Sequence, residues 1–131
     1  MGFKQLVIVL DTLDFMYFEQ TKAQIMKYYI HCFKNYAKFS GRASRTEYWS
    51  FFAINTIIAT IPLLLVAWGD GRLDELSIVS TIYSLVAFLP GLAVAVRRMQ
   101  DVGKSGWFIP VPIYNLVLAL TKGDEGTNEF G

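Results

Sequence analysis

Long stretches of the chain contain no Asp, Glu, Lys or Arg, and they fall at residues 48–68, 76–96 and 105–121. Crossing the ~30 Å hydrocarbon core of a bilayer takes about 20 predominantly apolar residues in a helix, and the first two stretches are that long. Trp49 and Trp68 lie at the two ends of the first stretch, and tryptophan is typical of membrane interfaces. The pattern therefore predicts two membrane-spanning helices, over residues 48–68 and 76–96.

The last uncharged stretch is shorter, and its residues 107–121 are predicted as a third span. A helix over residues 106–121 would measure about 24 Å, which is less than the ~30 Å core. Pro110 and Pro112 lie near its start, and the residue before a proline disfavours the α conformation. A re-entrant or tilted segment is the alternative to a third span.

Residues 21–39, which precede the first span, predict a basic amphipathic helix. Apolar and basic side chains recur at helical spacing on opposite sides of it: Ile25, Tyr29, Phe33 and Tyr36 on one side, and Lys27, His31, Lys34 and Lys38 on the other. Such a helix is expected to lie on the membrane surface. Packing of the helix against a partner protein is the alternative.

The expected fold class is an all-α integral membrane protein with about three transmembrane helices, preceded by this interfacial helix. Residues 21–131 are expected to form a single helical membrane domain, and residues 1–20 an N-terminal extension. The apolar run Leu6–Leu10 is too short for a signal peptide, and no small-residue cleavage site follows it.

The distribution of basic residues predicts the orientation. Seven Lys and Arg residues precede the first span, and the loop 97–105 holds three basic residues against Asp101 alone, whereas the turn 69–75 is acidic. The positive-inside rule therefore places the N-terminus and the loop 97–105 in the cytoplasm. With three spans the tail after residue 121 would face outward, and with a re-entrant third segment it would face inward.

Composition narrows the classes of function. Apolar residues make up 53% of the chain and charged residues only 18%, which is unlike an average soluble domain. The net charge of +1 gives no basic field for nucleic acid, so no nucleic-acid partner is expected. His31 and Cys32 are the only histidine and cysteine, and they are adjacent, which gives neither a metal site nor a Cys–His nucleophile. We therefore expect no metal, no cofactor and no enzymatic activity.

Charged residues gather at the predicted cytoplasmic mouths of the spans, in two segments. The candidate cluster consists of Arg42, Arg45, Glu47, Arg97, Arg98, Asp101 and Lys104. One hypothesis is that Glu47 and Asp101 pair with arginines across the two segments and fix the helix mouths together. A second is that the cluster forms a basic pocket for an anionic lipid head group or a partner. The alternative to both is solvated charge without specific pairing, because exposed ion pairs contribute only ~0–1 kcal/mol.

Small and weakly polar residues inside the spans are candidates for helix packing. They are Asn55, Ala59, Ser77, Ser80, Ser84, Gly91 and Asn115. Small residues allow membrane helices to approach closely, and the two asparagines would hydrogen-bond across helices. The alternative is a polar pathway for a solute. Packing is favoured, because the spans lack the ionisable residues that ion paths usually contain.

Three segments carry a family resemblance. GRASRTEYW, RRMQDVGKSGW and the tail GTNEFG occur in this order, and the chain from about Met26 onward resembles the domain of unknown function 805 family. The resemblance implies a small bacterial inner-membrane protein with several spans and no established biochemical activity. Gln100 stands where the family usually has histidine, and an amide does not titrate, which argues against acid–base chemistry at that position.

The favoured interpretation is a multi-pass structural or interaction protein of the bacterial inner membrane that contacts anionic lipid head groups. An oligomeric transporter or channel subunit is the second interpretation, because three short helices enclose a solute path only as an oligomer. An intramembrane enzyme ranks last. The expected partners are membrane lipids, a second copy of the chain or another membrane protein.

Overall fold

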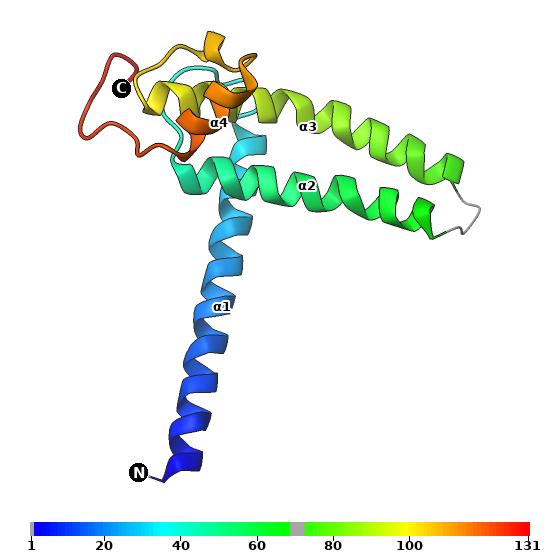
Figure 1. The fold of residues 1–131 in the computed structure, drawn as a ribbon, viewed down its shortest axis with the longest axis vertical. Coiled ribbons are helices and arrows are strands. Elements are labelled where there is room, and N and C mark those ends of the chain that lie inside the picture. Colours follow the sequence, from blue (N-terminus) through cyan, green and yellow to red (C-terminus); the bar gives the residue numbers. More distant parts are fainter. Residues whose placement is uncertain (1, 69–72) are drawn as a thin grey trace.

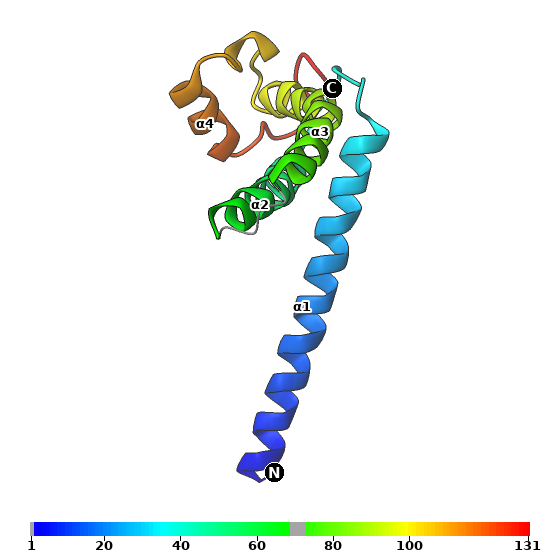
Figure 2. The same cartoon turned by 90° about the vertical axis from the view of Figure 1, so that its right-hand side faces the viewer.

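The computed structural model describes residues 2–68 and 73–131, and this part of the chain is helical without strands. Its helices are α1 (Phe3–Lys34), α2 (Arg45–Ala67), α3 (Leu73–Asp101), the 3-10 turn η1 (Gly106–Phe108) and α4 (Pro112–Leu120). Helix α1 projects away from the other elements, so that the N-terminus lies far from the C-terminus (Figure 1, Figure 2).

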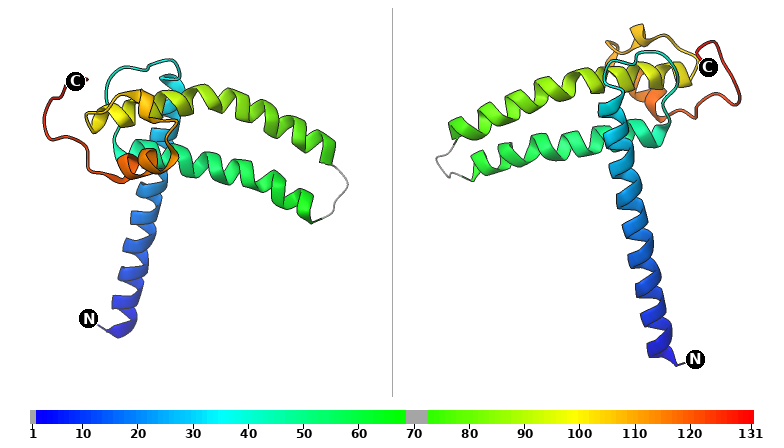
Figure 3. Two further views of the ribbon diagram at one scale, coloured as in Figure 1. Left: turned by 45° about the horizontal axis from the view of Figure 1, so that its top comes forward. Right: turned by 180° about the vertical axis from the view of Figure 1, so that it is seen from behind.

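Helices α2 and α3 form an antiparallel hairpin, and they are the two helices of the described residues that are long and apolar enough to cross a membrane (Figure 1, Figure 3). The two longest predicted spans, 48–68 and 76–96, correspond to these helices. Many of their apolar side chains are exposed, including Ile57 and Leu63. Apolar side chains without a protein neighbour are typical of a surface that faces lipid.

The predicted bounds of the first helix, 21–39, are wrong, because α1 starts at Phe3 and ends at Lys34. The expected extension 1–20 is thus continuous with the amphipathic segment. No proline or glycine lies between Phe3 and Ser40, so nothing interrupts helix propagation once it has begun. Residues 3–20 are exposed throughout.

The apolar side of the predicted amphipathic helix packs on protein. The rings of Tyr29 and Phe33 contact the ring of Phe51 on α2, with centroids 5.5 and 5.7 Å away. Cys32 lies between them in sequence and is fully buried. The C-terminal part of α1 therefore belongs to the folded core, which differs from the expected helix lying on the membrane surface.

Two small cores lie near the end of the hairpin where α2 begins and α3 ends, which we call the charged end. The first consists of Cys32, Ala43, Phe51 and Val94, and the second of Met99, Val102, Leu118 and Ala119. The second core attaches α4 to the last turns of α3. The far end of the hairpin has no comparable core among the described residues.

The predicted third helix over 107–121 is also wrong in its extent. The structure has the short turn η1 and then the nine-residue α4, which is about 14 Å long and covers half of a ~30 Å core. Pro112 stands at the start of α4, where its missing N–H costs no hydrogen bond within the helix. The tail then returns to α3, where Asp124 N donates to Asp101 O at 2.8 Å.

Candidate functional site

The antiparallel hairpin brings the two charged segments together. Ser44 caps α2, and its Oγ accepts a hydrogen bond from Glu47 N at 3.1 Å, which is typical of a helix start. This start places Glu47 in the first turn of α2. Arg97 and Arg98 lie in the last turns of α3, at the same end of the hairpin (Figure 1).

Glu47 and Arg97 form the first of two charged arrangements, which we call the helix pair. Arg97 Nη1 donates to Glu47 Oε1 at 2.8 Å, and both side chains are buried. The same carboxylate oxygen lies 3.2 Å from His31 Nδ1 and 3.7 Å from Cys32 Sγ. The helix pair therefore joins α1, α2 and α3.

The guanidinium of Arg97 is incompletely satisfied. Within the described residues, its Nε and Nη2 are buried and have no hydrogen-bond partner. Glu47 is the acceptor that offsets the cost of burying this charge.

The second arrangement is the tail network, formed by Arg42, Arg98 and Asp101. Arg42 Nε donates to Asp101 Oδ1 at 2.7 Å, and Arg98 Nη1 donates to Asp101 Oδ2. Arg98 is completely buried. It also donates to backbone carbonyls of three residues, which are Ala43, Ala119 and Thr121. All three nitrogens of Arg98 are therefore hydrogen-bonded.

Arg42 fixes the tail to the charged end. Its Nη1 donates to the carbonyls of Gly126 and Gly131, and its Nη2 donates to the carbonyl of Asp124. Asn128 Nδ2 donates to Gln100 O at 2.9 Å, which adds a contact between the tail and α3. All three segments that carry the family resemblance therefore meet at one place.

Both ion pairs expected across the two segments are present, since Glu47 binds Arg97 and Asp101 binds Arg42. Two further members of the cluster lie at its rim. Arg45 is exposed and its Nη1 donates to Leu120 O at 3.3 Å, and Lys104 is also exposed.

Two residues that contribute contacts at the charged end were not predicted from the sequence. His31, expected to be solvated, is half exposed and contacts Glu47. Gly123 lies so close to α3 that a Cβ at this position would overlap Asp101 Oδ2. The tail motif GTNEFG pointed to this region, but nothing in it indicated its partners.

Cys32 is fully buried beside the helix pair. Burial, and then the adjacent Glu47 carboxylate, raise the pKa of its thiol to about 12. The thiol is therefore protonated at neutral pH and is a poor nucleophile. Among the residues that the structure describes, no group of three His, Cys, Asp or Glu side chains is placed to hold a metal ion.

The predicted packing residues separate into two groups. Asn55 Oδ1 accepts from Tyr83 OH at 2.6 Å, and Tyr83 OH also lies 2.6 Å from Tyr29 OH, so this chain of hydrogen bonds joins three helices. Gly91 allows close approach, because a Cβ there would lie 3.3 Å from Phe51 Cε1. The predicted bond of Asn115 across helices is absent from the described residues, since its Nδ2 donates to Ile109 O and its Oδ1 has no partner.

The hydroxyl groups of Ser80 and Ser84 bond within α3 and not to another helix. Ser80 Oγ donates to Ser77 O, and Ser84 Oγ donates to Ser80 O, so both bond to their own helix. Ser77 and Ser84 are exposed. Ser84 and Ala59 face each other across a groove between α2 and α3.

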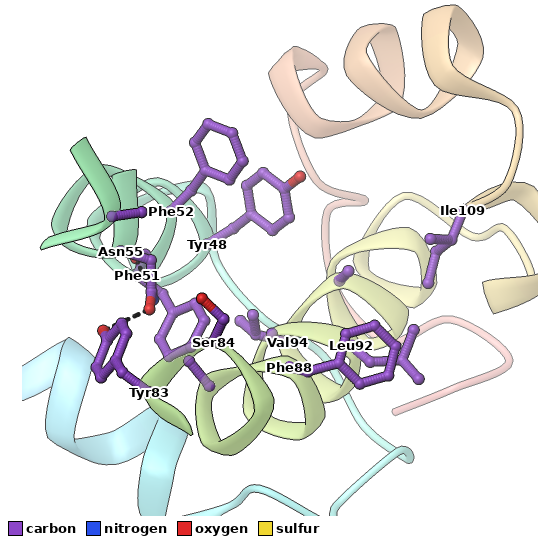
Figure 4. A pocket seen from close by; sticks show the side chains of 14 residues that line it. Tyr48, Phe51, Phe52, Asn55, Tyr83, Ser84, Phe88, Leu92, Val94 and Ile109 are labelled. Atoms are coloured by element: carbon purple, nitrogen blue, oxygen red, sulfur yellow. Dashed lines mark hydrogen bonds between the residues drawn. The ribbon is translucent and has the colours of Figure 1, made fainter. Parts of the chain in front are cut away.

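This groove, which we call the hairpin groove, has a volume of about 390 Å³ (Figure 4). Tyr48 and Phe52 of α2 form one wall, and Phe88 and Leu92 of α3 form the other. Ile109, which follows η1, also lines the groove. No charged side chain lines the groove among the described residues.

Comparison with known proteins agrees with the membrane character of the hairpin. Residues 36–131 match the family model described as "Protein of unknown function (DUF805)". The chain is 40% identical over 114 residues to "Inner membrane protein YhaI" of Escherichia coli strain K12, covering 81% of this chain and 93% of that protein. It is 36% identical to "Inner membrane protein YhaH" of the same strain, covering 81% and 94%. No solved structure matches.

Proposed function

This chain belongs to the DUF805 family, whose members are described as proteins of unknown function, and from that premise we propose that it is a structural or interaction protein of the bacterial inner membrane whose cytoplasmic face binds anionic lipid. Its relatives in Escherichia coli are named inner membrane proteins. We assign it no catalytic step, because the carboxylates of Glu47 and Asp101 are both engaged by arginine.

The proposal includes a topology with two spans. Helices α2 and α3 cross the bilayer, and the positive-inside rule puts their charged end in the cytoplasm. α4 is too short to cross, and the tail is hydrogen-bonded to Arg42 and Asp101. The tail is therefore on the cytoplasmic side with α1, which corresponds to the re-entrant alternative for residues 107–121.

One observation carries the proposal of lipid binding. The helix pair and the tail network occupy Arg42, Arg97 and Arg98, whereas three other basic side chains are exposed. They are Arg45 and Lys104, together with Lys38 in the segment between α1 and α2, and Trp107, which is 87% exposed, lies three residues after Lys104. Basic side chains beside an interfacial tryptophan suit an anionic membrane surface, and each contributes about 1 kcal/mol there.

Lipid retention tests this proposal directly. The protein is purified in mild detergent, mixed with equal amounts of phosphatidylglycerol and phosphatidylcholine, and analysed by native mass spectrometry. We expect it to retain phosphatidylglycerol preferentially, and the triple variant Lys38→Gln/Arg45→Gln/Lys104→Gln to lose that preference. The control, Lys4→Gln/Lys22→Gln/Lys27→Gln, removes equal charge from α1. Equal retention of both lipids, or equal loss in both variants, would contradict the proposal.

A second candidate function is an oligomeric transporter or channel subunit. The exposed hydroxyl residues Ser77 and Ser84 on α3 favour it, because an assembly of several copies would bring such faces together around a path. The native mass of the protein in lipid nanodiscs distinguishes the two. A closed oligomer would favour the subunit, and a monomer would leave the lipid-binding protein.

A further inference from the structure

We infer that the hairpin groove holds one acyl chain of an anionic phospholipid whose phosphate is bound by Arg45. This inference rests on the proposed lipid-binding function and names the site at which that function is exercised.

The length of the hairpin groove suits one acyl chain. Its lining on α3 runs from Ala95 to Tyr83, which is about 18 Å of helix. One leaflet contributes about half of the ~30 Å hydrocarbon core. A second hollow shares Ala59 and Ser84 with the groove and continues it toward Ser80. The groove therefore begins beside the charged end and extends through about one leaflet.

The lining of the groove favours hydrocarbon over a polar solute. Ala59, Ala87 and Gly91 keep the space between the aromatic walls open. Of its polar side chains, Asn55 and Tyr83 are hydrogen-bonded to each other, and Ser84 Oγ donates to Ser80 O. Because these three side chains have partners within the protein, contact with an acyl chain does not leave them unsatisfied.

A helix of a second copy suits the groove less well. A helix crossing the bilayer would need contact along the full ~30 Å of the core, whereas the lining of the groove on α3 extends over only about 18 Å.

Arg45 supplies the charge complementarity. It lies at spacing i, i+3, i+7 with Tyr48 and Phe52, so all three share one face of α2. Tyr48 and Phe52 form a wall of the groove, and Arg45 stands one turn before it, exposed, at the charged end. Within residues 2–68 and 73–131 no carboxylate pairs with Arg45, unlike Arg42, Arg97 and Arg98. A guanidinium binds phosphate oxygens in a bidentate manner.

Photocrosslinking of the full chain in nanodiscs tests the site. The probes are phosphatidylglycerol and phosphatidylcholine, each with a photoreactive group midway along one acyl chain, and the labelled residues are mapped by peptide mass spectrometry. We expect phosphatidylglycerol to label the groove, at Ala59, Ser84 or Phe88. Ala59→Leu fills the groove, and its matched control is Ala53→Leu, an exposed alanine of α2 outside the groove.

Ala59→Leu is expected to abolish groove labelling, while Ala53→Leu preserves it. Arg45→Gln is expected to lower groove labelling by phosphatidylglycerol about fivefold, the change that one basic residue near anionic lipid is worth, whereas Lys122→Gln leaves it unchanged. Labelling spread evenly over the exposed faces of α2 and α3 would overturn the inference. If phosphatidylglycerol is still retained preferentially, the proposed function survives that result.

Equal groove labelling by both lipids would overturn the role of Arg45, and equal retention in the mass spectra would then overturn the proposed function as well. The circular dichroism spectrum and melting temperature of each variant show that it remains folded.

Discussion

Arg97 and Arg98 are neighbours in the sequence and both are buried, but their surroundings differ. Arg98 donates to Asp101 and to three backbone carbonyls, whereas Arg97 has Glu47 as its acceptor, with Nε and Nη2 unpaired within the described residues. The charge of Arg98 is thus shared among several acceptors, and that of Arg97 depends on one carboxylate. Buried charges are costly when they lose their partner, so the two arrangements should tolerate damage differently.

The two arrangements also hold different parts of the molecule. The helix pair joins the packed helices, because its partners come from α1, α2 and α3. The tail network joins a loop and the tail to the last turn of α3. Loss of the helix pair is therefore expected to reduce global stability, whereas loss of the tail network is expected to loosen the tail first.

The largest loss of folding stability is expected from Glu47→Gln. This substitution leaves the buried Arg97 charge without a counter-ion, and removing one partner of a buried pair typically costs about 3–5 kcal/mol. Thermal unfolding in mild detergent, followed by circular dichroism, measures the effect. The control is Glu19→Gln, which breaks the exposed pair between Glu19 and Lys22 and should change stability by about 0–1 kcal/mol. Equal melting temperatures for both variants would show that the helix pair is not structural.

A smaller loss of folding stability is expected from Asp101→Asn. Arg98 and Arg42 lose the same carboxylate but keep their backbone acceptors, so the cost should be about 1–3 kcal/mol, as for one unsatisfied buried group. The same unfolding measurement applies, with the exposed Glu125→Gln as control. A loss as large as that of Glu47→Gln would contradict the distinction between the two arrangements.

A local effect is expected from Gly123→Ala. The added Cβ would overlap Asp101 Oδ2, so the tail must move away from α3 while the helices remain packed. We expect faster amide hydrogen exchange over residues 121–131 and a change of about 1 kcal/mol or less in global stability, because exposed segments open at low cost. Gly2→Ala, where a Cβ meets nothing within 4 Å, is the control. Unchanged exchange in the tail would refute the predicted displacement.

The charge-free stretches predicted α2 and α3 because the bilayer imposes a strong length requirement on apolar residues. They also located the two ion pairs, since Glu47 directly precedes the first stretch and Asp101 lies in the short charged loop between the second and the third. The bounds of α1 and α4 escaped prediction for a different reason. A pattern of side chains does not show how far a helix propagates beyond its amphipathic part, and two prolines reduced the third segment to nine helical residues.

The contacts of the tail could not be predicted from side-chain types. Arg98 and Arg42 bind backbone carbonyls of Thr121, Asp124 and Gly126. Every residue has such a carbonyl, so the sequence does not mark which ones serve as acceptors. The contact between His31 and Glu47 depends on how α1 meets α2, which neither residue specifies alone.

The smallest effect at neutral pH is expected at Cys32, which adjoins the helix pair without carrying charge there. Its pKa in the folded chain is about 12, above the ordinary value of about 8.5. At neutral pH the thiol is protonated in both the folded and the unfolded chain. The free energy of unfolding of Cys32→Ala should therefore differ from that of the parent by an amount that does not change with pH in this range. Between pH 8.5 and 12 the unfolded chain binds fewer protons than the folded chain, so stability falls as pH rises.

The parent should therefore lose stability relative to Cys32→Ala as the pH rises from 8 to 10, measured as the difference in melting temperature. Maleimide should also leave Cys32 unlabelled at pH 7 in the folded protein, while Ser40→Cys in a Cys32→Ser background, at an exposed loop position, is labelled readily. Rapid labelling of Cys32 would mean that α1 separates from α2 under native conditions, and the helix pair would then not hold the two helices together.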